Sequence, residues 1–161
     1  MFDKNILNRY VCTLFFGDGN KINCIIDTAC STSLIPLIFA KQHGEKLEHT
    51  ADVTVAGNTY KAILYRFSDL KFGNFIISKM VAFASDYKGN IADSALLGLN
   101  VLNNFVITLK RRGKELQFDY VPWVIVKDKP HPCTMFFKGK GSNPVYPNDF
   151  IVEFEVDDSI S

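Results

Sequence analysis

Short apolar or alternating runs, bounded by glycine, asparagine and proline, recur along the first 120 residues of this chain. Runs of this length with a period of two are typical of β-strands, and the turn residues between them favour tight hairpins. One short helix is predicted in the stretch L-I-F-A-K-Q-H, where Pro36 suits its first turn and Gly44 its end. The sequence therefore predicts an all-β fold with one or two short helices.

The predicted strands fall into hairpins and one strand-to-helix turn. Hairpins are expected at residues 10–16 with 21–26, at 52–66 around 56–59, at 70–83 around Gly73, and at 105–109 with 115–120. Residues 94–104 are predicted to form a strand that breaks at Gly98 into a short helix. Beyond Tyr120 prolines interrupt the pattern, which leaves strands or edge pieces at 123–126, 134–137 and 150–156.

Length, charge and cysteine content restrict the class of protein. A chain of 161 residues, 47% of them hydrophobic, suffices for one compact domain. Its 18 basic and 17 acidic side chains nearly cancel, so we expect no nucleic-acid and no membrane partner. Without a long apolar run or a signal-peptide pattern, a cytoplasmic location is expected. The four cysteines lack metal-site spacing, and we expect them to be reduced and mostly buried.

Asp27 is the leading candidate for a functional residue. It ends the apolar run C-I-I and begins a turn of small, mostly hydroxylated residues. A carboxylate that emerges from a buried strand is costly to desolvate unless other groups stabilise it, and such positions are often catalytic. Cys30 nearby is expected to be a packed residue, not a nucleophile, because the chain's histidines, which we place on the surface, have no visible link to it. These histidines are His43, His49 and His131.

The segment D-T-A-C-S at residues 27–31 resembles the active-site loop of the retropepsin-like aspartic proteases, hydrophobic-hydrophobic-D-[TS]-G-[AS]-[ST]. Two further features follow in the family's order. They are a hairpin around Gly57 and the stretch L-L-G-L-N-V-L at residues 96–102, which matches hydrophobic-hydrophobic-G-x-[DN]-hydrophobic-L. The resemblance covers about residues 10–120 and departs from the family at Ala29, where the family has glycine.

This resemblance implies a retropepsin-like (acid protease) closed β-barrel or sandwich with a flap hairpin. Residues 1–120 would form the protease domain, and residues 121–161 a C-terminal extension of it that shapes a dimer or covers the cleft. The implied activity is that of an aspartic endopeptidase, a hydrolase in which two carboxylates share a proton and face one water. Because the chain has one D-T-x-x-S motif, the second Asp27 must come from an identical subunit, which makes the enzyme a homodimer. The other acidic candidates lie in turns, polar loops or next to a charged hairpin: Asp18, Asp86, Asp93 and Asp119.

The resemblance also assigns roles to single residues. Asp27 would activate the water, Thr28 would brace the dyad across the dimer axis, and Ser31 would hydrogen-bond near the outer carboxylate oxygen. The remaining residues would form a structural turn (Leu97, Gly98 and Asn100) and a flap tip (Ala56, Gly57, Asn58 and Thr59). The flap would close over an extended peptide bound as an added β-strand, with no metal and no organic cofactor.

Ala29 leaves a second reading open. A methyl group in place of glycine could crowd the substrate or the dyad, and overpacking typically costs about 1–3 kcal/mol. If that cost falls on the transition state, the rate drops by roughly tenfold to a few hundredfold. The alternative function is therefore a catalytically weak or inactive retropepsin-fold dimer that acts as a peptide-binding or scaffold module. In a third reading, residues 121–161 are an inhibitory or dimer-shaping element.

Overall fold

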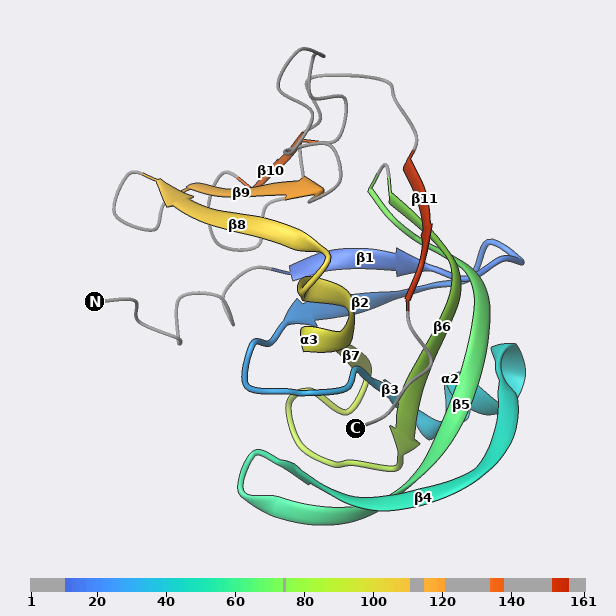
Figure 1. The fold of residues 1–161 in the computed structure, drawn as a ribbon. Coiled ribbons are helices and arrows are strands. Elements are labelled where there is room, and N and C mark those ends of the chain that lie inside the picture. The colour runs from blue at the N-terminus through green and yellow to red at the C-terminus, as the bar shows by residue number, and fades with distance from the viewer. Residues whose placement is uncertain (1–10, 74, 111–114, 121–133, 138–151, 157–161) are drawn as a thin grey trace.

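Most of the chain that the structure describes consists of strands wrapped around one core (Figure 1). The computed structural model describes residues 11–73, 75–110, 115–120, 134–137 and 152–156. Six strands close into a barrel in the order β6-β3-β7-β2-β1-β5 and back to β6, with β11 added beside β6 and β4 beside β5. The strands of this sheet are β1 (Val11–Phe15), β2 (Lys21–Ile26), β3 (Leu34–Pro36), β4 (Glu45–Val55), β5 (Asn58–Phe72), β6 (Phe75–Ser85), β7 (Ser94–Leu97) and β11 (Val152–Glu155).

The first predicted hairpin is confirmed and leads directly to the candidate residue. β1 and β2 pair antiparallel around the turn at residues 16–20, and β2 alternates between exposed and buried positions along most of its length. On its other side β2 pairs in parallel with β7, with Ile26 opposite Leu97. Both strands therefore end at the same edge of the barrel, which brings the turn after β2 next to the turn after β7.

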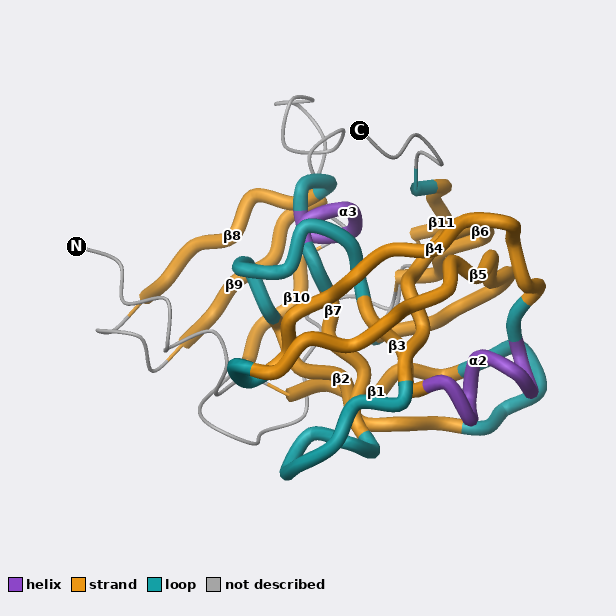
Figure 2. Tube along the Cα trace, turned by 90° about the horizontal axis from the view of Figure 1, so that it is seen from below, coloured by secondary structure: helices purple, strands orange, loops and turns teal. Residues whose placement is uncertain are grey.

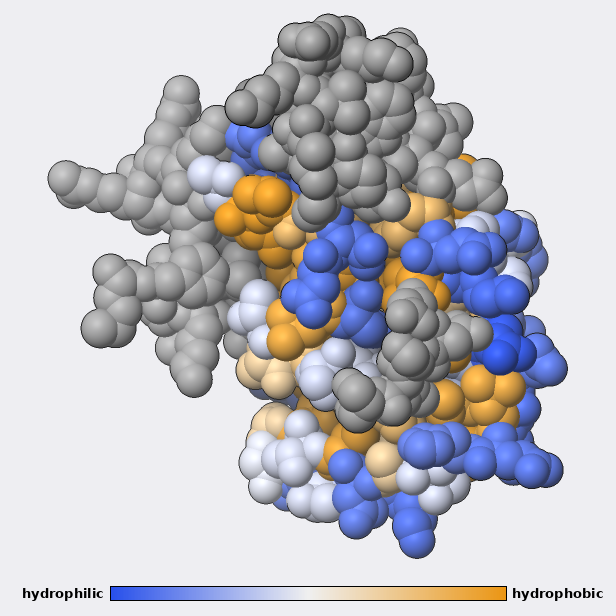
Figure 3. Space-filling view, viewed as in Figure 1, coloured by the Kyte–Doolittle hydropathy of each residue, from blue (hydrophilic) through white to orange (hydrophobic). Residues whose placement is uncertain are grey.

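The next strands are longer than the sequence predicts. β5 is one continuous strand where two were expected, and Asp69, with a φ of 57°, lies within it. β4 begins at Glu45 although strand structure was predicted only from Asp52. The first half of β4 is mostly exposed, and hydrophilic residues cover the right and lower margins of the face in Figure 3, where β4 and β5 curve in Figure 1. An edge strand of this kind shows no alternation of buried residues, so its sequence carries little strand signal.

Both predicted helical segments are present, and they lie apart from each other (Figure 2). Helix α2 (Leu37–His43) begins after Pro36 and ends at Gly44, as expected. Gly44 has an ordinary φ of −114°; glycine is needed there because a Cβ would lie 2.8 Å from Cε1 of Phe67. Helix α3 (Leu99–Leu102) follows β7 across Gly98. Within the described ranges, neither helix has the length and apolar character required to cross a membrane.

The expectation of surface histidines is wrong for His43. Its side chain is only 7% exposed, because the ring stacks on Phe16 at 4.3 Å and Nδ1 lies 3.1 Å from a carboxylate oxygen of Asp18. His49 is exposed, as expected, and His131 lies outside the described residues. The imidazole of His43 thus fastens the end of α2 to the β1–β2 turn.

A cluster of phenylalanines joins the last strands to the barrel. β8 (Phe105–Lys110) and β9 (Glu115–Tyr120) form the predicted hairpin, and β10 (Thr134–Phe137) pairs with β9. β11 pairs in parallel with β6. The ring of Phe105 contacts those of Phe75, Phe118 and Phe154 at 4.8–5.8 Å, all near edge-to-face.

These contacts bear on the predicted extension. The strands predicted at 134–137 and 150–156 are confirmed, and the one at 123–126 lies outside the described residues. The boundary at residue 120 stays a prediction. β11 nevertheless supplies both a strand of the barrel sheet and a core side chain, Phe154.

We expect Phe154→Ala to lower the free energy of unfolding by about 3–5 kcal/mol, because it leaves a cavity beside Phe105. Urea unfolding followed by fluorescence or circular dichroism measures this change. The matched control is Glu155→Gln at the adjacent exposed position, which we expect to stay within about 0.5 kcal/mol of the wild type. A Phe154→Ala chain as stable as the control would show that the Phe154 side chain adds nothing to the barrel's stability.

Candidate active site

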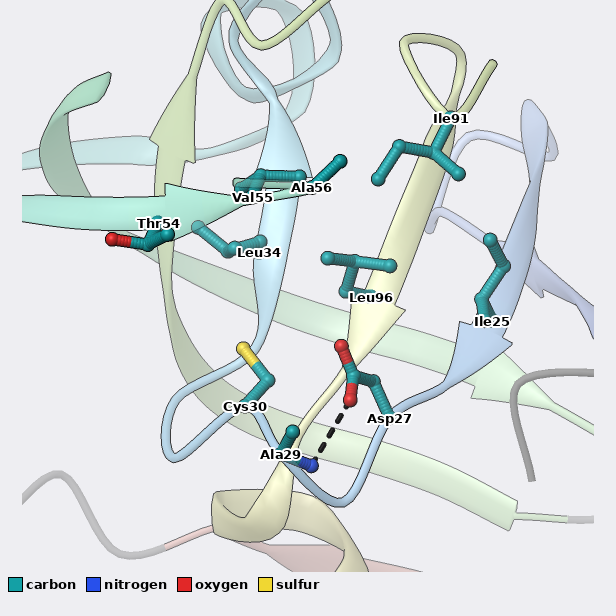
Figure 4. A pocket seen from close by; sticks show the side chains of 10 residues that line it. All are labelled: Ile25, Asp27, Ala29, Cys30, Leu34, Thr54, Val55, Ala56, Ile91 and Leu96. Atoms are coloured by element: carbon teal, nitrogen blue, oxygen red, sulfur yellow. Dashed lines mark hydrogen bonds between the residues drawn. The ribbon is translucent and has the colours of Figure 1, made fainter. Parts of the chain in front are cut away.

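Asp27 lies at the end of β2, with its half-buried carboxylate pointing into a pocket (Figure 4). Its backbone N–H donates to the carbonyl of Leu97 at 3.0 Å, which continues the pairing of β2 with β7. Its Oδ1 accepts a hydrogen bond of 3.0 Å from the backbone N–H of Ala29. The backbone of Cys30 donates in turn to the Asp27 carbonyl at 3.3 Å. A tight turn therefore fixes the orientation of the carboxylate.

The turn at Gly98 supports this loop from behind. The backbone N–H of Leu99 donates to the Cys30 carbonyl at 2.7 Å, and that of Asn100 to the Ser31 carbonyl at 3.1 Å. The two backbones approach so closely that a Cβ on Gly98 would lie 2.6 Å from the Cys30 carbonyl oxygen. The structure thus brings the predicted turn residues Leu97, Gly98 and Asn100 to the loop that carries Asp27.

Ser33, which was not predicted from the sequence, joins the Asp27 loop to the Gly98 turn. It is almost fully buried, and its hydroxyl donates to Oδ1 of Asn100 at 2.7 Å while accepting from the Gly98 N–H at 2.9 Å. The Ser33 N–H donates to the same Asn100 oxygen, and Nδ2 of Asn100 donates to the Val81 carbonyl. The only sequence signal for Ser33 was its place among small hydroxylated residues, and the pairing with a residue 67 positions away carried none.

The pocket above Asp27 has a volume of about 340 Å³ and a mostly apolar wall. Its lining combines the loop after β2, the barrel strands, the β4–β5 hairpin and the loop before β7: Ile25, Asp27, Ala29, Cys30, Leu34, Thr54, Val55, Ala56, Ile91 and Leu96. In Figure 4, Val55, Ala56 and Ile91 stand across the pocket from the Asp27 carboxylate. The tip of the β4–β5 hairpin therefore lies across the pocket from Asp27.

The turn of the β4–β5 hairpin is narrower than residues 56–59, the range expected for a flap tip. Val55 pairs with Asn58, so the turn consists of Ala56 and Gly57, with φ values of 50° and 82°. Asn58 and Thr59 begin β5; they and Gly57 are exposed and lie outside the pocket lining, whereas Ala56 lines it. A left-handed φ costs a residue with a Cβ about 1–2 kcal/mol, so Ala56 holds a strained turn over the pocket.

The wall that carries Ile91 is tied to the hairpin. The hydroxyl of Tyr60 on β5 accepts a hydrogen bond of 3.2 Å from the backbone N–H of Lys88. The Tyr87 hydroxyl donates to the carbonyl of Ser94 at the other end of the same loop. Ile91, Tyr60 and Val55 belong to one hydrophobic cluster. These contacts join the loop that carries Ile91 and the β4–β5 hairpin into one packed unit.

Ala29 fits this loop without backbone strain. It is not among the described residues that have a positive φ, and its side chain is exposed at the pocket surface. Thr28 is half-buried, and Ser31 is exposed, with its carbonyl rather than its hydroxyl held by the Gly98 turn. Any crowding by the Ala29 methyl group would therefore arise with a substrate or a second subunit, not within this fold.

Cys30 has the properties of a packed thiol. Burial, and secondarily the charge of Asp27, raises the pKa of Cys30 to about 12. Its Sγ donates a hydrogen bond to the carbonyl of Thr32 at 2.7 Å. The thiol keeps its proton at neutral pH, so it cannot act as the thiolate nucleophile of a cysteine enzyme. Among the described residues, no group of three or more histidine, cysteine, aspartate or glutamate side chains is placed to hold a metal ion.

Comparison with known proteins identifies the family. The gag-polyprotein putative aspartyl protease family matches residues 17–104, more than half of the chain. The protease of EIAV in complex with the inhibitor HBY-793 is 17% identical over 63% of this chain and 92% of its own, with a TM-score of 0.48. A retropepsin-like aspartic protease from Rickettsia conorii is 19% identical over 63% of this chain and 76% of its own, with a TM-score of 0.46. No curated protein matches the sequence.

The matched segment contains the Asp27 loop, the β4–β5 hairpin and the Gly98 turn. The described part of the chain is mostly strands in a closed barrel with two short helices, as the sequence predicts. The chain belongs to the gag-polyprotein putative aspartyl protease family.

Proposed function

We propose that this protein is an aspartic endopeptidase that acts as a homodimer, with one Asp27 from each subunit. The observation that carries the proposal is the position of the Asp27 carboxylate. It is held by the Ala29 N–H, lies at the wall of a mostly apolar pocket, and faces the flap residues Val55 and Ala56.

The proposed mechanism uses both carboxylates and one water. The ionised Asp27 accepts a proton from the water as its oxygen attacks the peptide carbonyl carbon, while the protonated Asp27 of the other subunit donates its proton to the carbonyl oxygen. The tetrahedral intermediate then collapses as the first Asp27 gives the proton it took from the water to the nitrogen of the scissile bond, which leaves as an amine, while one hydroxyl of the intermediate returns its proton to the Asp27 of the other subunit. Two adjacent carboxylates hold one shared proton because they cannot both ionise cheaply.

The other residues of the site are assigned supporting roles. Thr28 braces the dyad across the dimer axis, and Ser31 hydrogen-bonds near the outer carboxylate oxygen. The flap excludes water above the peptide, which binds as an added strand. The hydrogen bonds between the Gly98 turn, which includes Asn100, and the Asp27 loop support these roles, because they hold the loop in place before a substrate binds.

Cleavage as a function of enzyme concentration tests this proposal. Because each active site needs two chains, the rate per chain should fall on dilution below the dimer dissociation constant, in parallel with the dimer fraction measured by sedimentation. A quenched-fluorescence peptide library supplies the substrate. A rate per chain that stays constant while the protein becomes monomeric would contradict a site shared between subunits.

The exposed methyl group of Ala29 favours one rival, a retropepsin-fold dimer that binds peptides without efficient turnover. We expect Ala29→Gly to raise kcat/KM by about tenfold or more if the methyl group crowds the transition state. The measurement is peptide cleavage, with folded protein verified by circular dichroism. If neither the wild type nor Ala29→Gly cleaves peptides while the dimer still binds them, the scaffold function is the correct one.

A further inference from the structure

Two of the chain's cysteines lie opposite each other inside the barrel. Cys12 on β1 and Cys24 on β2 are directly paired in the antiparallel register of the first hairpin. Both side chains are buried in the core, and both are free thiols in this structure. Directly opposed residues of an antiparallel pair point to the same face of the sheet, so the two sulfur atoms lie on the same side of the hairpin.

The position of this pair along the hairpin suits a disulfide. The backbone N–H of Phe16 donates to the carbonyl of Asn20 at 2.8 Å, so these two residues form a hydrogen-bonded pair beside the turn. Hydrogen-bonded and non-hydrogen-bonded pairs alternate along an antiparallel ladder, which makes Cys12 and Cys24 another hydrogen-bonded pair. Cα atoms in such a pair are about 5.5 Å apart, within the range of about 4.4–6.8 Å that disulfides span.

The two thiols already contact each other. They share a hydrogen bond, and this bond, followed by burial, raises the pKa of Cys24 well above its usual range. The thiolate is the form that attacks an oxidant, so the folded, reduced chain reacts slowly at neutral pH. Oxidation therefore proceeds before the hairpin is buried, or while the hairpin is open.

We propose that Cys12 and Cys24 form a cross-strand disulfide when the chain folds in the presence of a disulfide oxidant such as oxidised glutathione. The thiolate of one cysteine attacks the oxidant, which gives a mixed disulfide and releases one glutathione thiol. The thiolate of the other cysteine then attacks the cysteine sulfur of the mixed disulfide and releases the second glutathione. Overall the protein loses two electrons and two protons, and the oxidant is reduced to two thiols.

The bridge closes the loop of residues 12–24 and links β1 to the strand that ends next to Asp27. It restricts the unfolded chain, which is the main way in which a disulfide stabilises a fold. For a loop of this size in a chain of 161 residues, we expect Tm to rise by about 4–10 °C. The redox conditions during folding thus set how strongly the chain resists unfolding. This effect does not depend on the proposed peptidase activity.

Refolding of the full chain in a mixture of oxidised and reduced glutathione tests the proposal. A protease that cleaves before aspartate separates Cys12, Cys24 and Cys30 into three peptides, because Asp18 and Asp27 lie between them. After free thiols are alkylated, mass spectrometry of the digest shows which peptides are linked. We expect the Cys12 and Cys24 peptides to be joined in most of the refolded protein and to separate when a reductant is added. A digest without this link would overturn the proposal.

Three comparisons make the test specific. The chain that is folded and reduced beforehand should acquire the bridge at least about tenfold more slowly in the same mixture, because both thiols are buried. Equal rates would contradict oxidation during folding. The bridged chain should melt about 4–10 °C above the same chain after reduction. This difference should persist in Cys30→Ala and vanish in Cys12→Ala. A bridged chain that melts at or below the reduced one would show that the hairpin does not accommodate the disulfide.

Discussion

Asp27→Asn is expected to remove peptide cleavage while leaving the fold intact. The asparagine Oδ1 can still accept the hydrogen bond from the Ala29 N–H, so the turn keeps its geometry. The amide cannot take a proton from water, and loss of general acid–base catalysis lowers rates by roughly 10²–10⁴-fold or more. Peptide cleavage and thermal unfolding, measured on the same preparation, check both halves of the expectation. Activity that persists in this variant would exclude Asp27 from the mechanism.

Two further measurements make the test specific. Asp93→Asn changes an exposed acidic residue outside the pocket, so its activity should equal that of the wild type. Because the Asp27 charge disfavours the Cys30 thiolate, the pKa of Cys30 should fall in Asp27→Asn while staying raised by burial. A titration of thiol alkylation against pH detects this shift. When wild-type and Asp27→Asn chains are mixed, activity should fall more steeply than the fraction of wild-type chains, because mixed dimers hold one aspartate.

The hairpins and the strand-to-helix turn at Gly98 could be predicted from local patterns in the sequence, because these elements depend on neighbouring residues. The β1–β2 hairpin, α2 and the β8–β9 hairpin follow from alternation and turn residues alone. β4 and β5 were predicted less well, since the exposed first half of β4 lacks alternation and two separate strands were expected where β5 is continuous. β5 runs without a break because its first part pairs with β4 and most of its length pairs with β6, and the alternation of single residues does not encode this overlap.

The candidate site, like the fold, could be predicted only where it depends on residues that are close in the sequence. The sequence predicted Asp27 from its place at the end of an apolar strand, and the resemblance to a family added the Gly98 turn. It did not predict Ser33, whose role depends on a hydrogen bond to Asn100 that only the closed barrel creates. The place of Ile91 in the pocket wall also requires the folded chain, because segments far apart in sequence form that pocket.

Gly98→Ala is expected to damage both stability and activity, through a backbone contact and not through backbone angles. Gly98 has an ordinary φ of −99°, so a Cβ is not excluded by conformation. It would instead lie 2.6 Å from the Cys30 carbonyl oxygen and 3.0 Å from the Thr32 carbonyl carbon. Both are backbone atoms of the Asp27 loop, and they cannot yield without moving that loop. We expect a loss of about 1–3 kcal/mol in the free energy of unfolding and a fall in Tm of about 2–12 °C.

The displacement of the Asp27 loop should also weaken the hydrogen bonds that join it to the Gly98 turn. Moving Cys30 away from Gly98 lengthens the hydrogen bond from the Leu99 N–H and the one from the Gly98 N–H to Ser33, so the Asp27 carboxylate loses its fixed position. Misplacement by about 1 Å can cost 10²-fold in rate, so cleavage should fall much further than the folded fraction. The matched control is Gly17→Ala, because a Cβ there meets its nearest atoms at 3.8 Å and φ is not positive. If Gly98→Ala unfolds at the same temperature as Gly17→Ala and cleaves peptides equally well, the close contact between the two turns does not hold the active-site loop in place.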